Sequence, residues 1–406
     1  MKSEPLGALL INDMDPAESK GAASIALDLA SRVFGNDDFV YLCTTKKSKT
    51  KNPKEDVHFE YLTENSLDRA RDKVRNRFPA LEGIMRVFAI RRLWRIFLTT
   101  RRLSPKVVWV HQIGWRIPVT SLLLFSFLKV PVFLTIHDYS FLRFRKLYPN
   151  DFSADGRSVE ASLKNFHING SPLNLKLKSK ISLWHRAYRF IISRTCSVIY
   201  ISELQSSIYR SAGYPSGFVV NNTVKPCNCS DIKEGIATVD DDLDVLFAGR
   251  MIGKGLERVV ESVSLSNQVH LHLAGENDLV DYVQDKLPSH RFTYHGMLNE
   301  QNLYRLIHSV DITAVSSACF DVFPTITIES IAHQTPVIST PTTGNFNFSR
   351  SVDESLGLSL SGVIPFEVLG TVIQSRASRA NLEKIQTLVS SDATEKKYRS
   401  LFSNLS

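Results

Sequence analysis

Two carboxylates in the second half of the chain have a spacing that suits one shared ligand. Asp321 and Glu329 lie eight positions apart, with Phe323-Pro324 and an apolar run between them. If a helix begins near Thr325, Glu329 sits about one turn into it, while Asp321 lies in the loop ahead. The two acids then need not share a helix face, and they can reach opposite ends of one ligand.

A simpler interpretation of these acids also stays open. Asp321 could be a solvated loop residue and Glu329 could lie on an exposed helix face. Ile328, Ile331 and Ala332 around Glu329 instead favour a helix that packs on a sheet. The Thr-Ile-Thr-Ile stretch has poor intrinsic helix propensity, so packing would have to impose that helix.

The stretch from Gly249 to Gly255 is a second pattern that could do chemistry. An apolar run ends at Gly249-Arg250, a turn carries Lys254-Gly255, and apolar residues at helical spacing follow. Backbone N–H groups and the positive end of the helix dipole at such a junction suit a phosphate. Arg250 and Lys254 would add two positive charges that stabilise a diphosphate leaving group. An ordinary strand-to-helix turn with two solvated cations is the alternative, because such turns are common.

The elements that position these residues alternate between strand and helix. Strands are predicted at 6–13, 38–45, 57–63, 107–113, 131–138, 197–203 and 217–223 in the first half, and at 244–250, 269–275, 292–296, 312–317 and 336–340 in the second. A polar stretch separates the two halves. The sequence therefore predicts an α/β fold of two Rossmann-like domains, residues 1–225 and 243–406, which are joined by a linker at 226–242 and face each other across a cleft.

Length and composition agree with two domains. A chain of 406 residues exceeds one ordinary core, and 43% hydrophobic with 22% charged residues is typical of a soluble globular protein. Five scattered cysteines predict reduced thiols in a cytoplasmic protein and no zinc site. The first residues indicate a strand and not a signal peptide. Residues 119–136 are interrupted by Lys129 and Pro131, so they favour a core helix and a core strand over a membrane span.

Residues 319–345 resemble the E-x7-E segment of family 4 glycosyltransferases, in the variant with Phe-Pro after the first acid. The resemblance covers nearly the whole chain and is strongest over 244–345. It implies the GT-B architecture, in which the second half binds the donor and the first half binds the acceptor. It also implies retaining transfer of a sugar from a nucleotide-sugar donor, with no metal ion and no other cofactor.

The resemblance also assigns roles to individual residues. Arg250 and Lys254 bind the donor diphosphate, at a spacing one residue shorter than is usual in the family. Glu329 holds the ribose hydroxyls, while Asp321, where Glu is usual, and His137 act as catalytic residues near the anomeric carbon. A histidine at a strand end is otherwise a common structural feature. The remaining assignments are Gly21 in a loop over the diphosphate, Met297 beside the nucleoside, and the donor-sugar loop Phe323, Pro324 and Thr325.

Residues 69–106 carry the chain's positive excess. They contain twelve Lys or Arg and two acids, a net charge of +10 against +8 for the whole chain. Val87, Ile90, Trp94 and Phe97 would share one helical face beside arginines, a pattern typical of docking on an anionic membrane. The expected acceptor is then lipid-linked or a glycan, and the protein is peripheral at the inner face of the cytoplasmic membrane. A core-packed helix with a solvated basic face is the alternative. No nucleic-acid-binding module accompanies the charge.

Two other functions fit the same fold. One is a nucleotide-sugar epimerase or hydrolase, and the other is a non-catalytic nucleotide-sugar-binding protein. Asp at position 321 and the short spacing from Arg250 to Lys254 keep the second open. The acids at 240–242 fall in the predicted linker and are interpreted as solvated. Transfer of sugar in cell-surface polysaccharide or glycolipid synthesis remains the favoured function.

Overall fold

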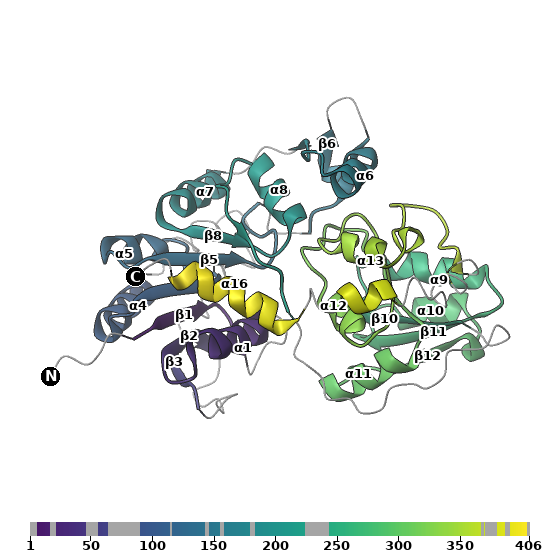
Figure 1. The fold of residues 1–406 in the computed structure, drawn as a ribbon, viewed down its shortest axis with the longest axis horizontal. Helices are drawn as coiled ribbons and strands as arrows, with labels where there is room; N and C mark the ends of the chain where they lie inside the picture. The colour runs from purple at the N-terminus through teal and green to yellow at the C-terminus, as the bar shows by residue number, and fades with distance from the viewer. Residues whose placement is uncertain are drawn as a thin grey trace.

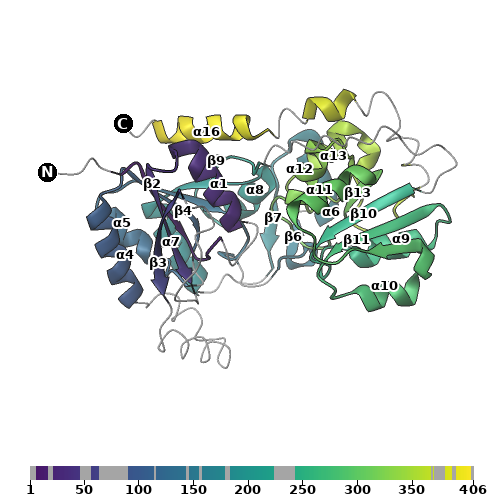
Figure 2. The same ribbon diagram turned by 90° about the horizontal axis from the view of Figure 1, so that it is seen from below.

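The computed structural model of the chain describes residues 6–16, 22–45, 56–63, 90–113, 116–142, 146–154, 158–178, 183–223, 243–366, 369, 380–385 and 390–403. Their elements form two lobes, each built on one parallel sheet with helices layered on it (Figures 1 and 2). The predicted linker at 226–242, residues 69–89 of the basic segment and Gly21 lie outside the described residues.

The first sheet has seven strands in the order β3-β2-β1-β4-β5-β8-β9, and all neighbours run parallel. The strands are β1 (Ala8–Asn12), β2 (Phe39–Thr45), β3 (His58–Thr63), β4 (Val107–Gln112), β5 (Val132–Ile136), β8 (Ser197–Tyr200) and β9 (Phe218–Val219). β1 and β5 are buried along their whole length, because helices cover both faces of the sheet's centre. All seven strands predicted in the first half are confirmed.

The second sheet has five parallel strands in the order β12-β11-β10-β13-β14. They are β10 (Leu243–Gly249), β11 (Val269–Gly275), β12 (Phe292–Tyr294), β13 (Ile312–Val315) and β14 (Val337–Ser339). Each strand lies within the apolar run that predicted it. The α/β fold with two Rossmann-like sheets is therefore confirmed.

Helices connect the strands in both lobes. The first lobe contains α1 (Ala22–Phe34), α4 (Ile90–Leu103), α5 (Ser121–Phe127), α7 (Leu183–Thr195) and α8 (Glu203–Ser211). The second contains α9 (Leu256–Ser264), α10 (Val280–Lys286), α11 (Glu300–Ser309), α12 (Thr325–Ala332) and α13 (Phe346–Val352). Short 3₁₀ helices among the described residues include η2 (Pro149–Asp151), η3 (Ser289–Arg291) and η4 (Glu354–Leu356). Helix α5 followed by β5 confirms the interpretation of residues 119–136, and no described helix is long and apolar enough to cross a membrane.

A small insertion from the first half packs on the second lobe. It comprises β6 (Phe152–Ala154), α6 (Val159–Asn169) and β7 (Leu175–Leu177), with β6 and β7 paired antiparallel. In α6, His167 Nε2 lies 3.0 Å from the Pro341 carbonyl oxygen, and the Glu160 carboxylate accepts a hydrogen bond of 3.2 Å from the Leu360 N–H. Phe152 meets Phe320 edge-on. The sequence analysis did not predict β6 and β7, which are only three residues long.

Helix α16 (Ser391–Ser403) crosses in the other direction and lies along α1 on the first lobe (Figure 2). Its Tyr398 is fully buried, with its ring centroid 4.8 Å from that of Trp109. Phe402 contacts Phe34 and Phe133. The predicted boundaries, 1–225 and 243–406, therefore do not describe α16 or the insertion. The cause is the wide aromatic face of the first sheet, which α1 and α16 cover together.

Candidate functional site

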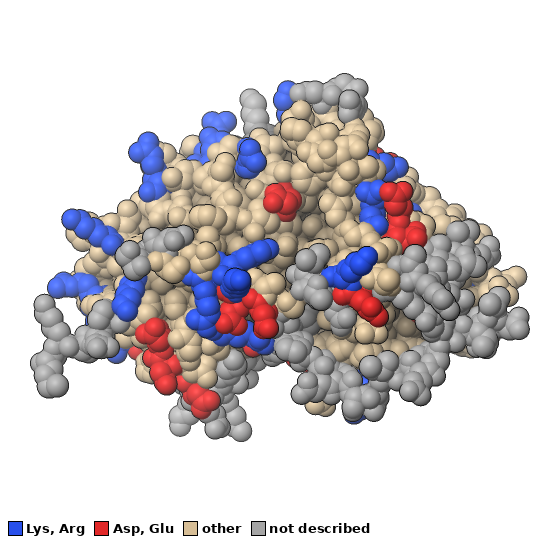
Figure 3. All heavy atoms as spheres, viewed as in Figure 1, with Lys and Arg blue, Asp and Glu red and all other residues tan. Residues whose placement is uncertain are grey.

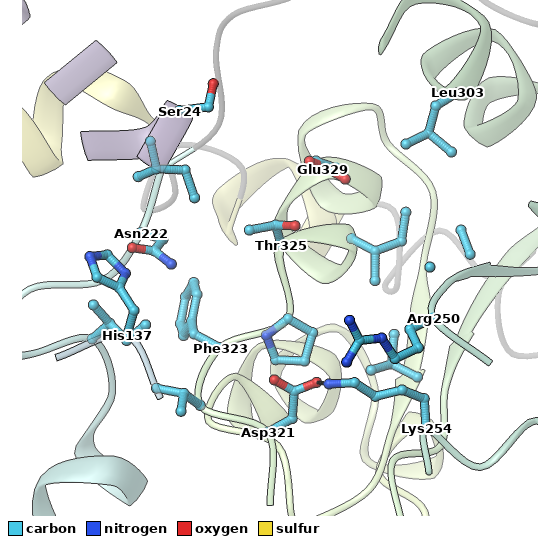
Figure 4. Close-up of a pocket in the computed structure, with 18 of the residues that line it drawn as sticks. Ser24, His137, Asn222, Arg250, Lys254, Leu303, Asp321, Phe323, Thr325 and Glu329 are labelled. Carbon is cyan, nitrogen blue, oxygen red and sulfur yellow. Dashed lines mark hydrogen bonds and ion pairs between the residues drawn. The ribbon is translucent and has the colours of Figure 1, made fainter. Parts of the chain in front are cut away.

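A cavity of about 740 Å³ lies between the two lobes, at the carboxyl ends of the parallel strands. Ligands bind at this edge in open α/β sheets. Its walls combine residues of both halves, from Ser24 and Asp28 on α1 and Asn222 after β9 to the β10–α9 turn and α12. Figure 4 shows the side chains that point into it.

The turn between β10 and α9 has the backbone shape that the glycine pattern predicts. Gly249, Gly253 and Gly255 all have positive φ, and Gly255 is the left-handed cap before α9. A Cβ on Gly255 would lie 2.0 Å from the Ser316 carbonyl oxygen, so only glycine lets the turn approach β13 so closely. The start of α9 is thereby held against the sheet edge, directly after Arg250 and Lys254, which line the cavity.

The two cations of this turn are placed differently. Arg250 is largely exposed, and its Nε lies 3.8 Å from a carboxylate oxygen of Glu276, so the guanidinium is held only weakly. Lys254 forms an ion pair and hydrogen bond with Asp321. Both Arg250 and Lys254 line the cavity, side by side in Figure 4. The arrangement places two cationic side chains at the position where the resemblance to family 4 glycosyltransferases predicts the donor diphosphate.

Asp321 is fixed by backbone contacts on both of its sides. Its N–H donates to the Thr342 carbonyl oxygen at 3.0 Å, and its own carbonyl oxygen accepts from the Gly344 N–H at 2.9 Å. Gly344 lies so close to Val322 that a Cβ would meet the Val322 carbonyl oxygen at 1.7 Å. The carboxylate therefore enters the cavity from a rigid crossing of two loops.

Glu329 sits on α12, which begins at Thr325 as predicted and packs through Thr327, Ile328 and Ile331. That packing explains how a stretch of poor helix formers becomes helical. Burial, and to a lesser extent the nearby Glu300 carboxylate, raise the pKa of Glu329 to about 7. Figure 4 places Asp321 and Glu329 at opposite ends of the drawn wall. Asp321 thus lies in the loop ahead of α12 and Glu329 about one turn into the helix, as predicted.

His137 follows β5 directly and lies across the cavity from Arg250 (Figure 4). Burial lowers the pKa of His137 to about 4, so its imidazole is neutral at neutral pH. Its Nε2 lies 2.9 Å from Nδ1 of His111, the residue before the last in β4. The sequence analysis included His111 in a strand but did not single it out as a site residue.

The remaining predicted site residues divide into two groups. Phe323, Pro324 and Thr325 line the cavity between the two acids. Met297 does not line it, since its side chain is 67% exposed and the neighbouring Leu298 forms the wall instead. The structure also brings in residues that sequence reasoning missed, and these are Ser24, Ile25, Asp28, Asn222, Glu300, Leu303 and Tyr304. Of these, Glu300, Leu303 and Tyr304 lie on α11. The sequence signal for this helix is Asn299, a residue type typical of helix N-caps, which caps α11 in the structure.

Helices α4, α5 and α7 form a second candidate functional surface, which we call the three-helix face. The helices pack side by side and contain no Asp or Glu. Seven large apolar side chains on this face are at least 45% exposed: Ile90, Trp94, Leu98, Leu123, Phe127, Leu183 and Phe190. Lys and Arg side chains are spaced along the same side of the molecule in Figure 3.

Aromatic and cationic groups of the three-helix face are in contact with one another. Trp94 stacks on Phe97 with ring centroids 5.6 Å apart, and the Arg101 guanidinium lies over the Phe97 ring. Arg194 lies over Phe190 in the same way. Arg92 differs from the other arginines, because it is buried and donates to the Arg116 carbonyl oxygen. The exposed side of α4 therefore combines aromatic rings with arginines, and is not a solvated basic face alone.

Two Rossmann-like lobes that face each other across a shared cavity define the GT-B class of glycosyltransferase folds. Residues 242–357 match the family model described as glycosyl transferases group 1. The matched residues lie within the second lobe and include all five strands of its sheet. A search of curated protein sequences found no significant match.

Solved structures with this fold align along nearly the whole chain. Anabaena Alr3699/HepE in complex with UDP and glucose aligns with a TM-score of 0.66 and 14% identity, over 98% of this chain and 100% of that one. Sucrose-phosphate synthase from Thermosynechococcus elongatus aligns with a TM-score of 0.67 and 15% identity, over 98% and 99%. The apo form of the lipopolysaccharide outer core galactosyltransferase WaaB aligns with a TM-score of 0.65 and 13% identity, over 98% and 100%. At these identities the likeness establishes the fold, and the predicted GT-B architecture is confirmed.

Proposed function

We propose that the protein is a retaining glycosyltransferase of family 4. It moves a sugar from a nucleoside diphosphate donor to a lipid-linked or polysaccharide acceptor in cell-surface glycan synthesis. One observation carries the proposal: the cations of the β10–α9 turn and the acids of the α12 segment line one cavity with His137. Nucleotide-sugar chemistry needs this combination, because the leaving group is anionic and the ribose and sugar present hydroxyls.

In the proposed mechanism the donor diphosphate lies on the N-terminus of α9. Arg250 and Lys254 stabilise the charge that grows on the leaving group as the sugar bond breaks. A bound diphosphate would share Lys254 with Asp321, which keeps the ammonium group aimed at the cavity. These two cations supply the charge that a metal ion supplies in other phosphate sites, so we propose that transfer needs no metal.

The other side chains hold the donor at its two ends. Glu329 accepts hydrogen bonds from the ribose hydroxyls, and Asp321 contacts the sugar. His137 lies near the anomeric carbon from the opposite wall. The acceptor enters from the first lobe and attacks on the face from which the diphosphate leaves, which retains the anomeric configuration.

The first experiment measures nucleoside diphosphate release from a panel of nucleotide sugars, with and without a membrane extract as acceptor source. We expect release from one donor that depends on the extract and is lost in Glu329→Ala and Arg250→Ala. Arg210→Ala, an exposed arginine on α8, is the matched control and keeps full activity. Equal release without extract would indicate hydrolase or epimerase chemistry. Donor binding with no release would indicate a non-catalytic binding protein.

The three-helix face supports the membrane part of the proposal. Exposed aromatic residues insert into the interface of an anionic bilayer, and neighbouring arginines are attracted to its lipid headgroups. The helices of this face contain no Asp or Glu that would repel those headgroups. We propose that it docks the protein at the inner face of the cytoplasmic membrane, close to lipid-linked acceptors.

Vesicle sedimentation tests this docking. The protein should bind phosphatidylglycerol vesicles, bind less at high salt, and bind phosphatidylcholine vesicles weakly. The triple substitution Trp94→Ser, Phe127→Ser and Phe190→Ser should abolish binding. A control with Leu265→Ser and Val363→Ser, which changes exposed residues of the second lobe, should not. Equal binding by both variants would contradict docking through this face.

A further inference from the structure

The buried His111 and the partly buried His137 meet at the ends of neighbouring strands on the first-lobe side of the cavity. β4 and β5 pair in parallel, with Val110 opposite Leu134, so His111 and His137 emerge on the same face of the sheet. His111 Nδ1 lies 2.9 Å from His137 Nε2, and the two rings are nearly parallel, with 21° between their planes. Only His137 lines the cavity.

The ring of His111 is held firmly in place. Trp109 lies two residues earlier on the same face, and its ring centroid is 4.3 Å from that of His111. Trp109 itself is fully buried and donates from Nε1 to the Thr135 hydroxyl at 2.9 Å. The His111 ring therefore packs against a buried indole that is itself anchored by a hydrogen bond.

The protons of the pair can be assigned from the groups around it. Burial lowers the pKa of both His111 and His137, so both rings are neutral at neutral pH and each carries one N–H. His111 Nε2 is buried without a hydrogen-bond partner among the described residues. If His137 donated to His111 Nδ1, the proton of His111 would sit on this isolated Nε2. A buried N–H without an acceptor is more costly than an unfilled lone pair, so His111 carries its proton on Nδ1 and donates it.

We propose that His111 is a positioning residue that holds His137 in the tautomer protonated on Nδ1. With Nε2 of His137 accepting from His111, the remaining ring nitrogen at the cavity wall is a donor. His137 then offers a neutral N–H to an oxygen of the bound sugar, and it has no free lone pair with which to act as a general base. This inference rests on the proposed function, because it takes the ligand beside His137 to be the donor sugar.

The tautomer can be measured in the intact protein by NMR. Long-range ¹H–¹⁵N correlations of ¹⁵N-histidine-labelled protein distinguish Nδ1–H from Nε2–H imidazoles, and loss of signals in His137→Gln assigns the residue. We expect His137 to be the Nδ1–H tautomer. An Nε2–H signal for His137 in the unsubstituted protein would overturn the proposal, whether or not the protein transfers sugar.

Two substitutions of His111 test its effect on ligand binding. His111→Asn places an amide donor close to the position of Nδ1, so the tautomer of His137 and donor affinity should stay near those of the unsubstituted protein. His111→Leu removes the donor that orients the His137 ring, so the ring is no longer held in one position and nucleotide-sugar affinity should fall about tenfold. Affinity for the nucleoside diphosphate, which lacks the sugar, should not change. An equal loss for both ligands, or no rescue by asparagine, would show that His111 is merely structural.

Discussion

The raised pKa of Glu329 makes the strongest quantitative prediction for this site. The carboxyl is partly buried on α12, and burial together with Glu300 raises its pKa from 4.5 to about 7. If the ionised form accepts the ribose hydroxyls, nucleotide binding must depend on pH near neutrality. Glu329→Gln keeps the shape of the side chain and removes the titration.

The size of the effect follows from the pKa. A carboxyl with a pKa of about 7 is about one-tenth ionised at pH 6 and about nine-tenths ionised at pH 8. Nucleoside diphosphate affinity should therefore rise about tenfold between these pH values in the unsubstituted protein. In Glu329→Gln the affinity should be lower at pH 8, and this component of the pH dependence should disappear.

The stability of the ligand-free protein should change in the opposite direction. The folded pKa of Glu329 lies above the unfolded value, so the folded state binds more protons between pH 4.5 and 7, and stability falls as pH rises through this window. The full shift corresponds to about 3 kcal/mol at pH 8, an upper limit because the carboxyl borders the cavity. Glu329→Gln should be more stable than the unsubstituted protein at pH 8 by up to that amount, and close to it at pH 4.5.

Isothermal titration at pH 6, 7 and 8 and constant ionic strength measures the binding part. Comparing the two proteins cancels the titration of the nucleotide phosphates, because both bind the same ligand. Urea unfolding at the same pH values measures the stability part. Parallel pH curves for the two proteins in both measurements would refute the assignment of a raised pKa and a ribose-binding role to Glu329.

Three further perturbations have expected outcomes. Lys254→Ala should weaken nucleoside diphosphate binding about 10- to 100-fold, measured by titration calorimetry, because a charge-assisted contact is lost. Gly255→Ala should lower the free energy of unfolding by more than about 2 kcal/mol, because its Cβ would meet the Ser316 carbonyl oxygen, whereas Gly35→Ala has the same φ with no atom nearby and should cost about 1 kcal/mol. Tyr398→Ala should cost about 3–5 kcal/mol in urea unfolding, because a fully buried aromatic ring is removed from the first lobe.

A different result would contradict each of these three predictions. An unchanged nucleoside diphosphate affinity in Lys254→Ala would show that the diphosphate does not bind at the start of α9. Equal costs at Gly255 and Gly35 would mean that the turn does not depend on its close approach to β13. A mild effect of Tyr398→Ala, below about 1 kcal/mol, would mean that α16 is not part of the first lobe's core.

Local patterns in the sequence predicted the sheets and the second-lobe part of the site. Continuous apolar runs identify buried parallel strands, and the glycines around Arg250 and the acids at 321 and 329 lie within single strand-to-helix connections. Their relative positions are therefore set by a few residues of chain. The same reasoning put α12 at Thr325, although its propensity is poor, because Ile328 and Ile331 mark a packed face.

What the sequence did not reveal depends on contacts between distant segments. His111 is one more residue in an apolar strand until β5 places His137 beside it. Nothing in the composition of α6 or α16 states which lobe it will cover, since an amphipathic helix fits many apolar surfaces. Met297 and Leu298 are adjacent, and the choice of which one lines the cavity depends on how the chain turns after β12.

The return of α16 to the first lobe has a consequence for the order of folding during synthesis. The ribosome releases β1 to β9 first, but the aromatic surface around Trp109 and Phe133 is covered only when Tyr398 and Phe402 arrive, after the whole second sheet. The nascent first half therefore leaves the ribosome with an apolar surface still open, the condition in which chaperones are recruited and partly folded chains aggregate. Residues 1–225 expressed alone should accumulate as insoluble protein, and adding residues 390–403 as a separate peptide should increase the soluble fraction.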